Sequence, residues 1–133
     1  MIKKNKLTPV EWEIMEAIWN LSGSPSVREV LESKFKNGEK AYTTIQTIMN
    51  NLVAKSHLTR KKIGLVNFYT PAKPRRSMVK TEVGAIISRV FRGSVPALAS
   101  HLIDEEKLTL AEIDDIKILL AAKEKQIRES QND

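Results

Sequence analysis

The 133-residue sequence has no cysteine and only two histidines, His57 and His101. Without cysteine there is no disulfide, no thiolate-bound metal and no cysteine nucleophile. Two isolated histidines exclude a histidine-rich zinc site and leave few candidates for a Ser-His-acid triad. The five glycines do not form a phosphate-binding loop. We therefore expect no catalytic residue, no cofactor, no metal site and no enzymatic activity.

Long apolar runs are also missing. Residues 95–99 and 118–122 are apolar runs of only five residues each, whereas a helix that spans a bilayer needs about 20. We therefore expect no membrane insertion and a cytoplasmic protein.

Positive charge is concentrated in one part of the chain. Residues 1–75 hold thirteen basic and six acidic side chains, and residues 76–133 hold nine and ten. Between Glu39 and Glu82 there is no acidic residue among 42, but there are nine lysines and arginines. Because carboxylates oppose the binding of a polyanion, this stretch indicates a nucleic-acid surface. The alternative is a helical protein-interaction adaptor whose basic half docks an acidic partner protein.

Two helices near the start of the chain are marked by their N-terminal signals. The pair Thr8 and Glu11 follows the pattern of a capping box, in which Ser or Thr precedes Glu by three residues. Ser26 and Glu29 repeat the pattern. Apolar residues recur at helical spacing after each pair, and Pro9 stands at the favoured first helical position. The pattern therefore predicts two helices.

A third helix is expected over residues 43–55, with two distinct faces. Apolar residues at helical spacing form a stripe for packing: Ile45, Ile48, Met49, Leu52 and Val53. The opposite face and the helix entry carry hydroxyls and amides but no charge, and such groups can bind base edges in the DNA major groove. The predicted DNA-binding residues of this helix are Tyr42, Thr43, Thr44, Gln46, Thr47 and Asn50.

An extended pattern follows, with two short strands over residues 58–63 and 65–70 around Gly64. Lys61 and Lys62 lie beside this turn and are predicted to contact phosphates, whereas Arg60 is expected to lie back over the hydrophobic base of the hairpin. Three helices and a basic hairpin form a winged helix-turn-helix, in which the third helix is the reading helix and the hairpin is the wing. Binding of double-stranded RNA by a winged helix is a further option.

Three more helices are expected after a linker, over about residues 77–91, 95–103 and 110–128, the last opened by the capping box of Thr109 and Glu112. Three helices in the last 58 residues can hardly enclose a core. Their apolar stripes either fold back on the first domain or pair with a second copy, and reading two half-sites favours pairing. The predicted dimerisation residues are Ile86, Val90, Leu98, Leu102, Ile113, Ile116 and Leu120.

The predicted fold class is mainly α, of the α+β type. A winged helix-turn-helix domain is expected over residues 1–74, and a three-helix dimerisation segment over residues 75–133.

Four motifs stand out in the sequence: LTPVEWEIM at residues 7–15, TIQTIM at 44–49, YTP at 69–71 and LTLAEI at 108–113. They resemble the motifs of the penicillinase repressor family, the bacterial repressors of β-lactamase and methicillin-resistance operons. These motifs occur in family order along nearly the whole chain. The resemblance implies a winged helix, C-terminal dimerisation helices, and a homodimer that represses transcription on a palindromic double-stranded DNA operator.

The sequence departs from the family pattern at three places. Leu65 follows the wing glycine where the family usually has arginine, and Ser56 replaces the glycine that commonly ends the reading helix. His101 and Leu102 align with the Asn-Phe bond that is cleaved in archetypal members. A sensor protease is thus implied as a partner by the resemblance alone. Relatives that sense copper through cysteine pairs are excluded, since cysteine is absent.

Overall fold

The computed structural model describes residues 6–105 and 107–132. The chain divides into two compact units, residues 1–82 and residues 83–133, and the division falls within helix α4 (Arg75–Val90). The predicted domain boundary after residue 74 lies at the start of this helix. The predicted domains also include residues 1–5, 106 and 133, which lie outside the described residues.

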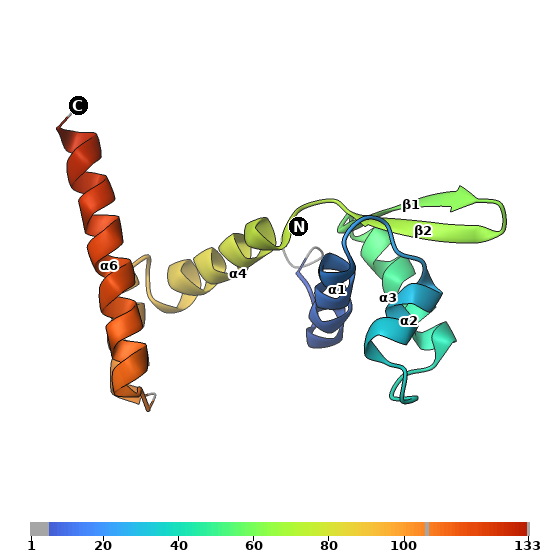
Figure 1. Ribbon diagram of the computed structural model, residues 1–133, viewed down its shortest axis with the longest axis horizontal. Coiled ribbons are helices and arrows are strands. Elements are labelled where there is room, and N and C mark those ends of the chain that lie inside the picture. Colours follow the sequence, from blue (N-terminus) through green and yellow to red (C-terminus); the bar gives the residue numbers. More distant parts are fainter. Residues whose placement is uncertain (1–5, 106, 133) are drawn as a thin grey trace. The chain divides into compact units, whose positions relative to one another are not determined.

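The first unit has the element order of a winged helix-turn-helix, which confirms the predicted fold class. Its two strands pair antiparallel and form the wing, which extends away from the ends of the helices (Figure 1). Before α4 the elements are α1 (Pro9–Leu21), α2 (Val27–Lys34), α3 (Tyr42–Ala54), β1 (Leu58–Ile63) and β2 (Val66–Pro71).

The core of this unit joins α1, α2 and α3 to the wing. The side chains with almost no exposed surface are Ile14, Met15, Ile18, Val30, Ile45, Met49, Leu52, Leu58 and Tyr69. Each large apolar side chain that becomes buried contributes about 1.5–3 kcal/mol to folding. The predicted apolar stripe of α3 belongs to this core, so the opposite, polar face of α3 is directed away from it.

Capping boxes begin α1 and α2, as the sequence predicts. The Glu11 N–H donates to Thr8 Oγ1 at 3.2 Å, and the Thr8 N–H donates to Glu11 Oε1 at 2.8 Å. Ser26 and Glu29 make the same pair of bonds. These side chains satisfy backbone N–H groups that a helix cannot pair internally.

Glu11 has a second role, because it ties the start of α1 to the end of α3. The residue is only 5% exposed, and its Oε1 lies 2.7 Å from Lys55 Nζ. Burial alone would raise the pKa of Glu11, but the hydrogen bond and charge of Lys55, together with hydrogen bonds from Thr8, lower the pKa below its ordinary value of 4.5. The charged pair therefore holds the end of α3 against the start of α1.

The reading helix ends in a Schellman motif that normally contains glycine. The Ser56 N–H donates to the Val53 carbonyl at 3.0 Å, and the His57 N–H donates to the Leu52 carbonyl at 2.9 Å. Ser56 has φ of +67°, in the left-handed region. The serine thus adopts the left-handed conformation for which glycine is usual at this position of the motif, and the helix end keeps its Schellman geometry.

Replacing Ser56 with glycine is expected to stabilise the protein by about 1 kcal/mol, because an L-residue is strained in the left-handed region. Thermal unfolding of both proteins measures this gain. Ser33→Gly is the matched control, because Ser33 lies in the right-handed helix α2, where glycine is unfavourable. A loss of stability in both variants would contradict the left-handed conformation of Ser56.

The second unit contains the remainder of α4, α5 (Val95–Glu105) and α6 (Leu110–Gln131). Thr109 and Glu112 form the predicted capping box at the start of α6. Among the described residues of this unit, no side chain is buried. A chain segment with many apolar residues and no buried side chain lacks a core of its own.

Candidate nucleic-acid interface

The polar face of α3 carries the six residues predicted from the sequence to bind DNA. Tyr42, Thr43, Thr44 and Thr47 are exposed, and Gln46 and Asn50 are half-buried. Because Ile45, Met49 and Leu52 are in the core, the helical period directs these polar residues outward. Two of the six make hydrogen bonds within the chain through their side chains, namely Thr47 and Asn50.

The N-terminus of α3 is open, unlike those of α1 and α2. Its N-cap residue is Ala41, no side chain caps it, and its first turn has no acidic residue. The first N–H groups of a helix have no internal partner, and they carry the positive end of the helix dipole. An uncapped, acid-free helix start at this position suits a backbone phosphate.

The Thr47 hydroxyl donates a hydrogen bond within the helix. Its Oγ1 donates to the Thr43 carbonyl at 2.9 Å. The oxygen can still accept a hydrogen bond, and the methyl group remains outside. Thr47 can therefore accept from a base donor or contact a thymine methyl group.

Asn50 lies at the junction between α3 and the wing. Its Oδ1 accepts hydrogen bonds from Arg60 Nη1 and from the Tyr69 hydroxyl, both at 2.8 Å. Arg60 thus reaches back from the wing to α3, where its guanidinium binds Asn50. The DNA contact predicted for Asn50 stays a prediction, and the structure adds that its carbonyl oxygen is held by the wing.

The wing has a tight two-residue turn. Ile63 pairs with Val66 around Gly64, whose φ is +64°, and Leu65. Glycine at the first central position is typical of a type II′ hairpin turn. The register is therefore fixed, and the side chains near the tip have defined faces.

Lys61 and Lys62 lie on opposite faces of the wing, because successive residues of a strand alternate. Lys62 shares its face with Arg60 and pairs with Asn67, and Lys61 pairs with Phe68 on the other face. Both lysines are exposed. Neither has an ion-pair partner within residues 6–105 and 107–132.

Not every basic residue of the acid-free stretch is available to DNA. Lys55 is paired with Glu11, and Arg75 Nε lies 2.7 Å from Glu16 Oε1. These two cations hold α1 in place. Of the other basic residues of this stretch, three lie in the wing (Arg60, Lys61 and Lys62) and three in the segment after it (Lys73, Arg76 and Lys80).

A surface hollow of about 270 Å³ lies where α2, α3 and the wing meet. Its lining residues are Ser26, Val27, Arg28, Tyr42, Gln46, Leu65, Val66, Asn67 and Tyr69. The Arg28 guanidinium stands 5.5 Å from the centre of the Tyr42 ring, within cation–π range. Arg28 was not among the residues predicted from sequence. The sequence signal that could have identified Arg28 is its position in the first turn of α2, the helix that precedes α3.

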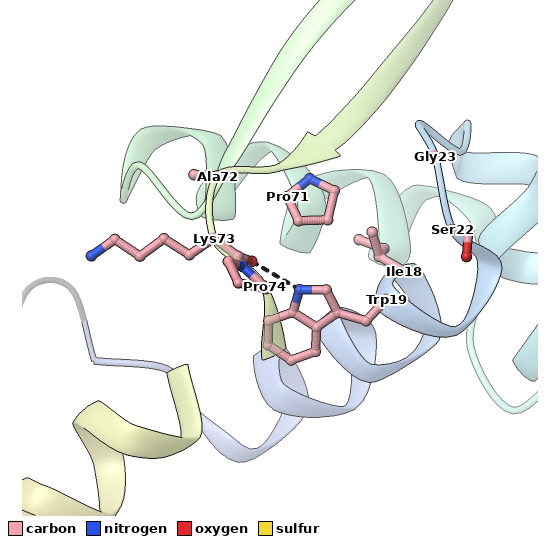
Figure 2. Close-up of a pocket in the computed structure, with 8 residues that line it drawn as sticks. All are labelled: Ile18, Trp19, Ser22, Gly23, Pro71, Ala72, Lys73 and Pro74. Carbon is pink, nitrogen blue, oxygen red and sulfur yellow. Dashed lines mark hydrogen bonds between the residues drawn. The ribbon is translucent and has the colours of Figure 1, made fainter. Parts of the chain in front are cut away.

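A second hollow, of about 300 Å³, lies away from this surface, between the end of α1 and the segment after β2. Figure 2 shows the Trp19 indole, whose Nε1 donates to the Lys73 carbonyl at 3.1 Å. None of the predicted DNA-binding residues lines this hollow. The bond fixes the chain segment that leads from the wing to α4.

The predicted dimerisation residues all lie in the second unit. Leu98 and Ile113 are half-buried, and the exposed ones are Ile86, Val90, Leu102, Ile116 and Leu120. Leu120 follows Ile118 and Leu119, which are also exposed, so this unit leaves a larger apolar surface uncovered than one leucine would.

The fold and this surface together define a winged helix-turn-helix protein of the DNA-binding class. The chain belongs to the penicillinase repressor family, whose sequence profile matches residues 7–122. Members of this family are transcriptional regulators, not enzymes, and the chain is accordingly a DNA-binding transcriptional repressor.

Three relatives show how far this similarity extends. The methicillin resistance regulatory protein MecI of Staphylococcus aureus strain N315 is 25% identical over 122 residues, which cover 91% of this chain and 98% of MecI. The transcriptional regulator BlaI of Mycobacterium tuberculosis strain H37Rv is 26% identical over 122 residues, with 91% and 87% covered. An uncharacterized 16.5 kDa protein of Latilactobacillus sakei, encoded in the ptsI 3′ region, is 26% identical over 119 residues, with 90% and 81% covered.

Within residues 6–105 and 107–132, no helix is both long enough and apolar enough to cross a membrane.

Proposed function

We propose that two copies of this chain bind a palindromic operator in the cytoplasm and repress transcription by occluding a promoter. The homodimer is inferred from one observation on the second unit: none of its described side chains is buried, although apolar residues are frequent there. Such a surface is unfavourable in water and favours association. A second copy is the natural partner, since most oligomers of soluble proteins are symmetric homodimers.

The repeated stripe of α6 supports this assignment. Ile113, Ile116 and Leu120 recur at helical spacing and share one face of the helix. In a twofold dimer the same face of each copy meets its counterpart, so one apolar stripe is sufficient for both sides.

We propose that α3 enters the major groove and that the wing contacts the flanking backbone. The exposed polar residues of α3 suit base edges, and its uncapped start suits a phosphate. Tyr42, Thr43 and Thr44 lie at that start, and Gln46 and Thr47 follow in the next turn. Lys61 and Lys62 supply charge from the wing.

The dimer predicts the spacing of the operator. Two reading helices related by a twofold axis reach successive major grooves when the half-site centres are about 10 base pairs, or a multiple of this, apart. The proposal does not include cleavage by a sensor protease between His101 and Leu102, because these residues replace the family's Asn-Phe pair.

Thr47→Ala and Lys61→Ala are expected to weaken DNA binding in different ways. Removing the Thr47 hydroxyl and methyl should change the preference among operator sequences, because this residue faces base edges. Removing Lys61 should weaken binding to operator and random DNA equally and reduce the slope of log affinity against log salt by about 0.9. Titrations of both variants against both duplexes over a salt series measure this. Equal effects of the two variants on both duplexes would contradict the assignment.

The experiment that tests the whole proposal starts from fragments of genomic DNA selected by the wild-type protein. A gel shift with increasing salt should show binding that weakens steeply, and the bound complex should contain two chains per site. Retention of an acidic protein, with no duplex retained, would support the adaptor alternative instead.

A further inference from the structure

Three residues from three elements form one hydrogen-bonded cluster at the root of the wing. Asn50 comes from α3, Arg60 from β1 and Tyr69 from β2. Arg60 and Tyr69 are direct partners across the two strands, so both side chains lie on the same face of the wing. Both donate to the single oxygen Oδ1 of Asn50 at 2.8 Å.

The chemistry of the cluster fixes the direction of both bonds. Arginine is always a donor, and the Tyr69 hydroxyl is protonated because burial raises the pKa of Tyr69 above its ordinary value of 10.0. Asn50 must therefore present its carbonyl oxygen to the wing. An adenine needs both the oxygen and the amide nitrogen of an asparagine, so this conformation of Asn50 cannot read adenine in that way.

The positive charge of Arg60 is not neutralised within this cluster. Its side chain is exposed and binds a neutral amide, and no carboxylate pairs with it among the described residues. Arg75 differs, because Glu16 neutralises it at 2.7 Å. A guanidinium has five N–H donors, and the bond to Asn50 leaves most of them for another acceptor.

We propose that Arg60 is a DNA phosphate contact and that Asn50 is a positioning residue that aims it, rather than a base reader. This inference rests on the proposed binding of DNA through α3 and the wing. Arg60 lies on the same face of the wing as Lys62, and Asn50 is on the reading helix. The cluster thus joins the two DNA-binding elements, and the arginine stands at their junction.

Positioning has a physical advantage for a long side chain. A free arginine loses rotamer freedom when it binds a phosphate, whereas an arginine already held by Asn50 has lost part of that freedom on folding. Asn50 should therefore increase affinity only through Arg60. The two residues should behave as one unit in mutagenesis.

A double-mutant cycle on a random-sequence duplex tests this. We expect Arg60→Ala to lower affinity and to reduce the slope of log affinity against log salt by about 0.9, the effect of one lost phosphate contact. Asn50→Ala should lower affinity in the wild-type background and have no further effect when Arg60 is already alanine. Arg60→Lys should keep the salt slope, because the charge remains, but not the full affinity.

Two further variants separate positioning from folding. Tyr69→Phe breaks the other bond to Asn50 and leaves Arg60, so it should lower thermal stability but preserve the salt slope. Asn50→Asp keeps an acceptor for both donors, but its carboxylate neutralises Arg60. We therefore expect Asn50→Asp to fold and to show the reduced slope of Arg60→Ala, which keeps the test valid if Asn50→Ala fails to fold.

The outcomes distinguish the inference from the proposed function. If Asn50→Ala has the same effect with and without Arg60, then Asn50 contacts DNA by itself and the inference is overturned. An unchanged salt slope in Arg60→Ala would overturn the phosphate contact. If the wild-type protein binds no duplex, the proposed function fails, whatever these variants show.

Discussion

Replacing Ile116 with aspartate is expected to make the protein monomeric and to lower its affinity for the operator by about 100-fold or more. Ile116 lies on the apolar stripe of α6 between Ile113 and Leu120. A carboxylate buried in an apolar interface without a partner costs several kcal/mol. Loss of the dimer also removes the gain of binding two half-sites at once, which can reach about 10²–10⁴ in affinity.

Sedimentation equilibrium and operator titration measure the two effects of Ile116→Asp separately. Lys125→Asp is the matched control, because it introduces the same side chain on the opposite side of α6 by helical period. We expect this control to remain a dimer. A dimeric Ile116→Asp would show that the stripe is not the interface, and a monomer with full operator affinity would show that two copies are not required.

Replacing Lys55 with methionine is expected to destabilise the protein by about 2–3 kcal/mol at neutral pH, because a buried Glu11 carboxylate loses its partner. The expected loss is at the lower end for buried pairs, since the Lys55 side chain is 27% exposed and the Glu11 side chain 6%. Denaturant unfolding of both proteins gives the difference in free energy.

The pH dependence of this difference identifies its cause. In the wild-type protein the pKa of Glu11 is below its ordinary value of 4.5, so its stabilisation is complete above that pH and is lost as the pH falls through the lower native value. In Lys55→Met, burial of the unpaired carboxylate should raise the pKa of Glu11, and protonation then removes the penalty. The difference between the two proteins should therefore shrink as the pH falls toward 4.5 and below.

An exposed ion pair provides the control for Lys55→Met. Arg75 and Glu16 are as close, at 2.7 Å, but the Arg75 side chain is 57% exposed. Arg75→Met should cost less than about 1 kcal/mol, as is typical of exposed pairs. A pH-independent loss in Lys55→Met would show that its methylene packing, rather than the charge pair, stabilises the contact between α1 and α3.

Much of the fold could be predicted because its signals are local. Thr8 and Glu11, and likewise Thr109 and Glu112, are three residues apart, and their pairing requires only the first turn of a helix. The apolar stripe of α3 needs only helical period, and the position of the wing follows from Gly64 and the change to an extended pattern. In each case the residues that determine the structure are neighbours along the chain.

The details of the site depend on contacts that sequence pattern does not contain. Asn50 was predicted to face DNA because it shares a face with Gln46 and Thr47, but Arg60 and Tyr69 approach it from the wing. The conformation of Ser56 is not evident from the sequence, because serine rarely takes positive φ, and it becomes visible only in its φ of +67° and in the two Schellman hydrogen bonds. The surroundings of Asn50 depend on how α3 and the wing meet, and the conformation of Ser56 depends on local strain that the fold tolerates.

Hydroxyl-radical footprinting of a selected genomic fragment tests most directly whether a dimer of this chain reads two symmetric half-sites. The proposal predicts two protected segments related by a twofold axis, with centres about 10 base pairs or a multiple of this apart. Protection of a single, non-palindromic segment would contradict the dimeric repressor.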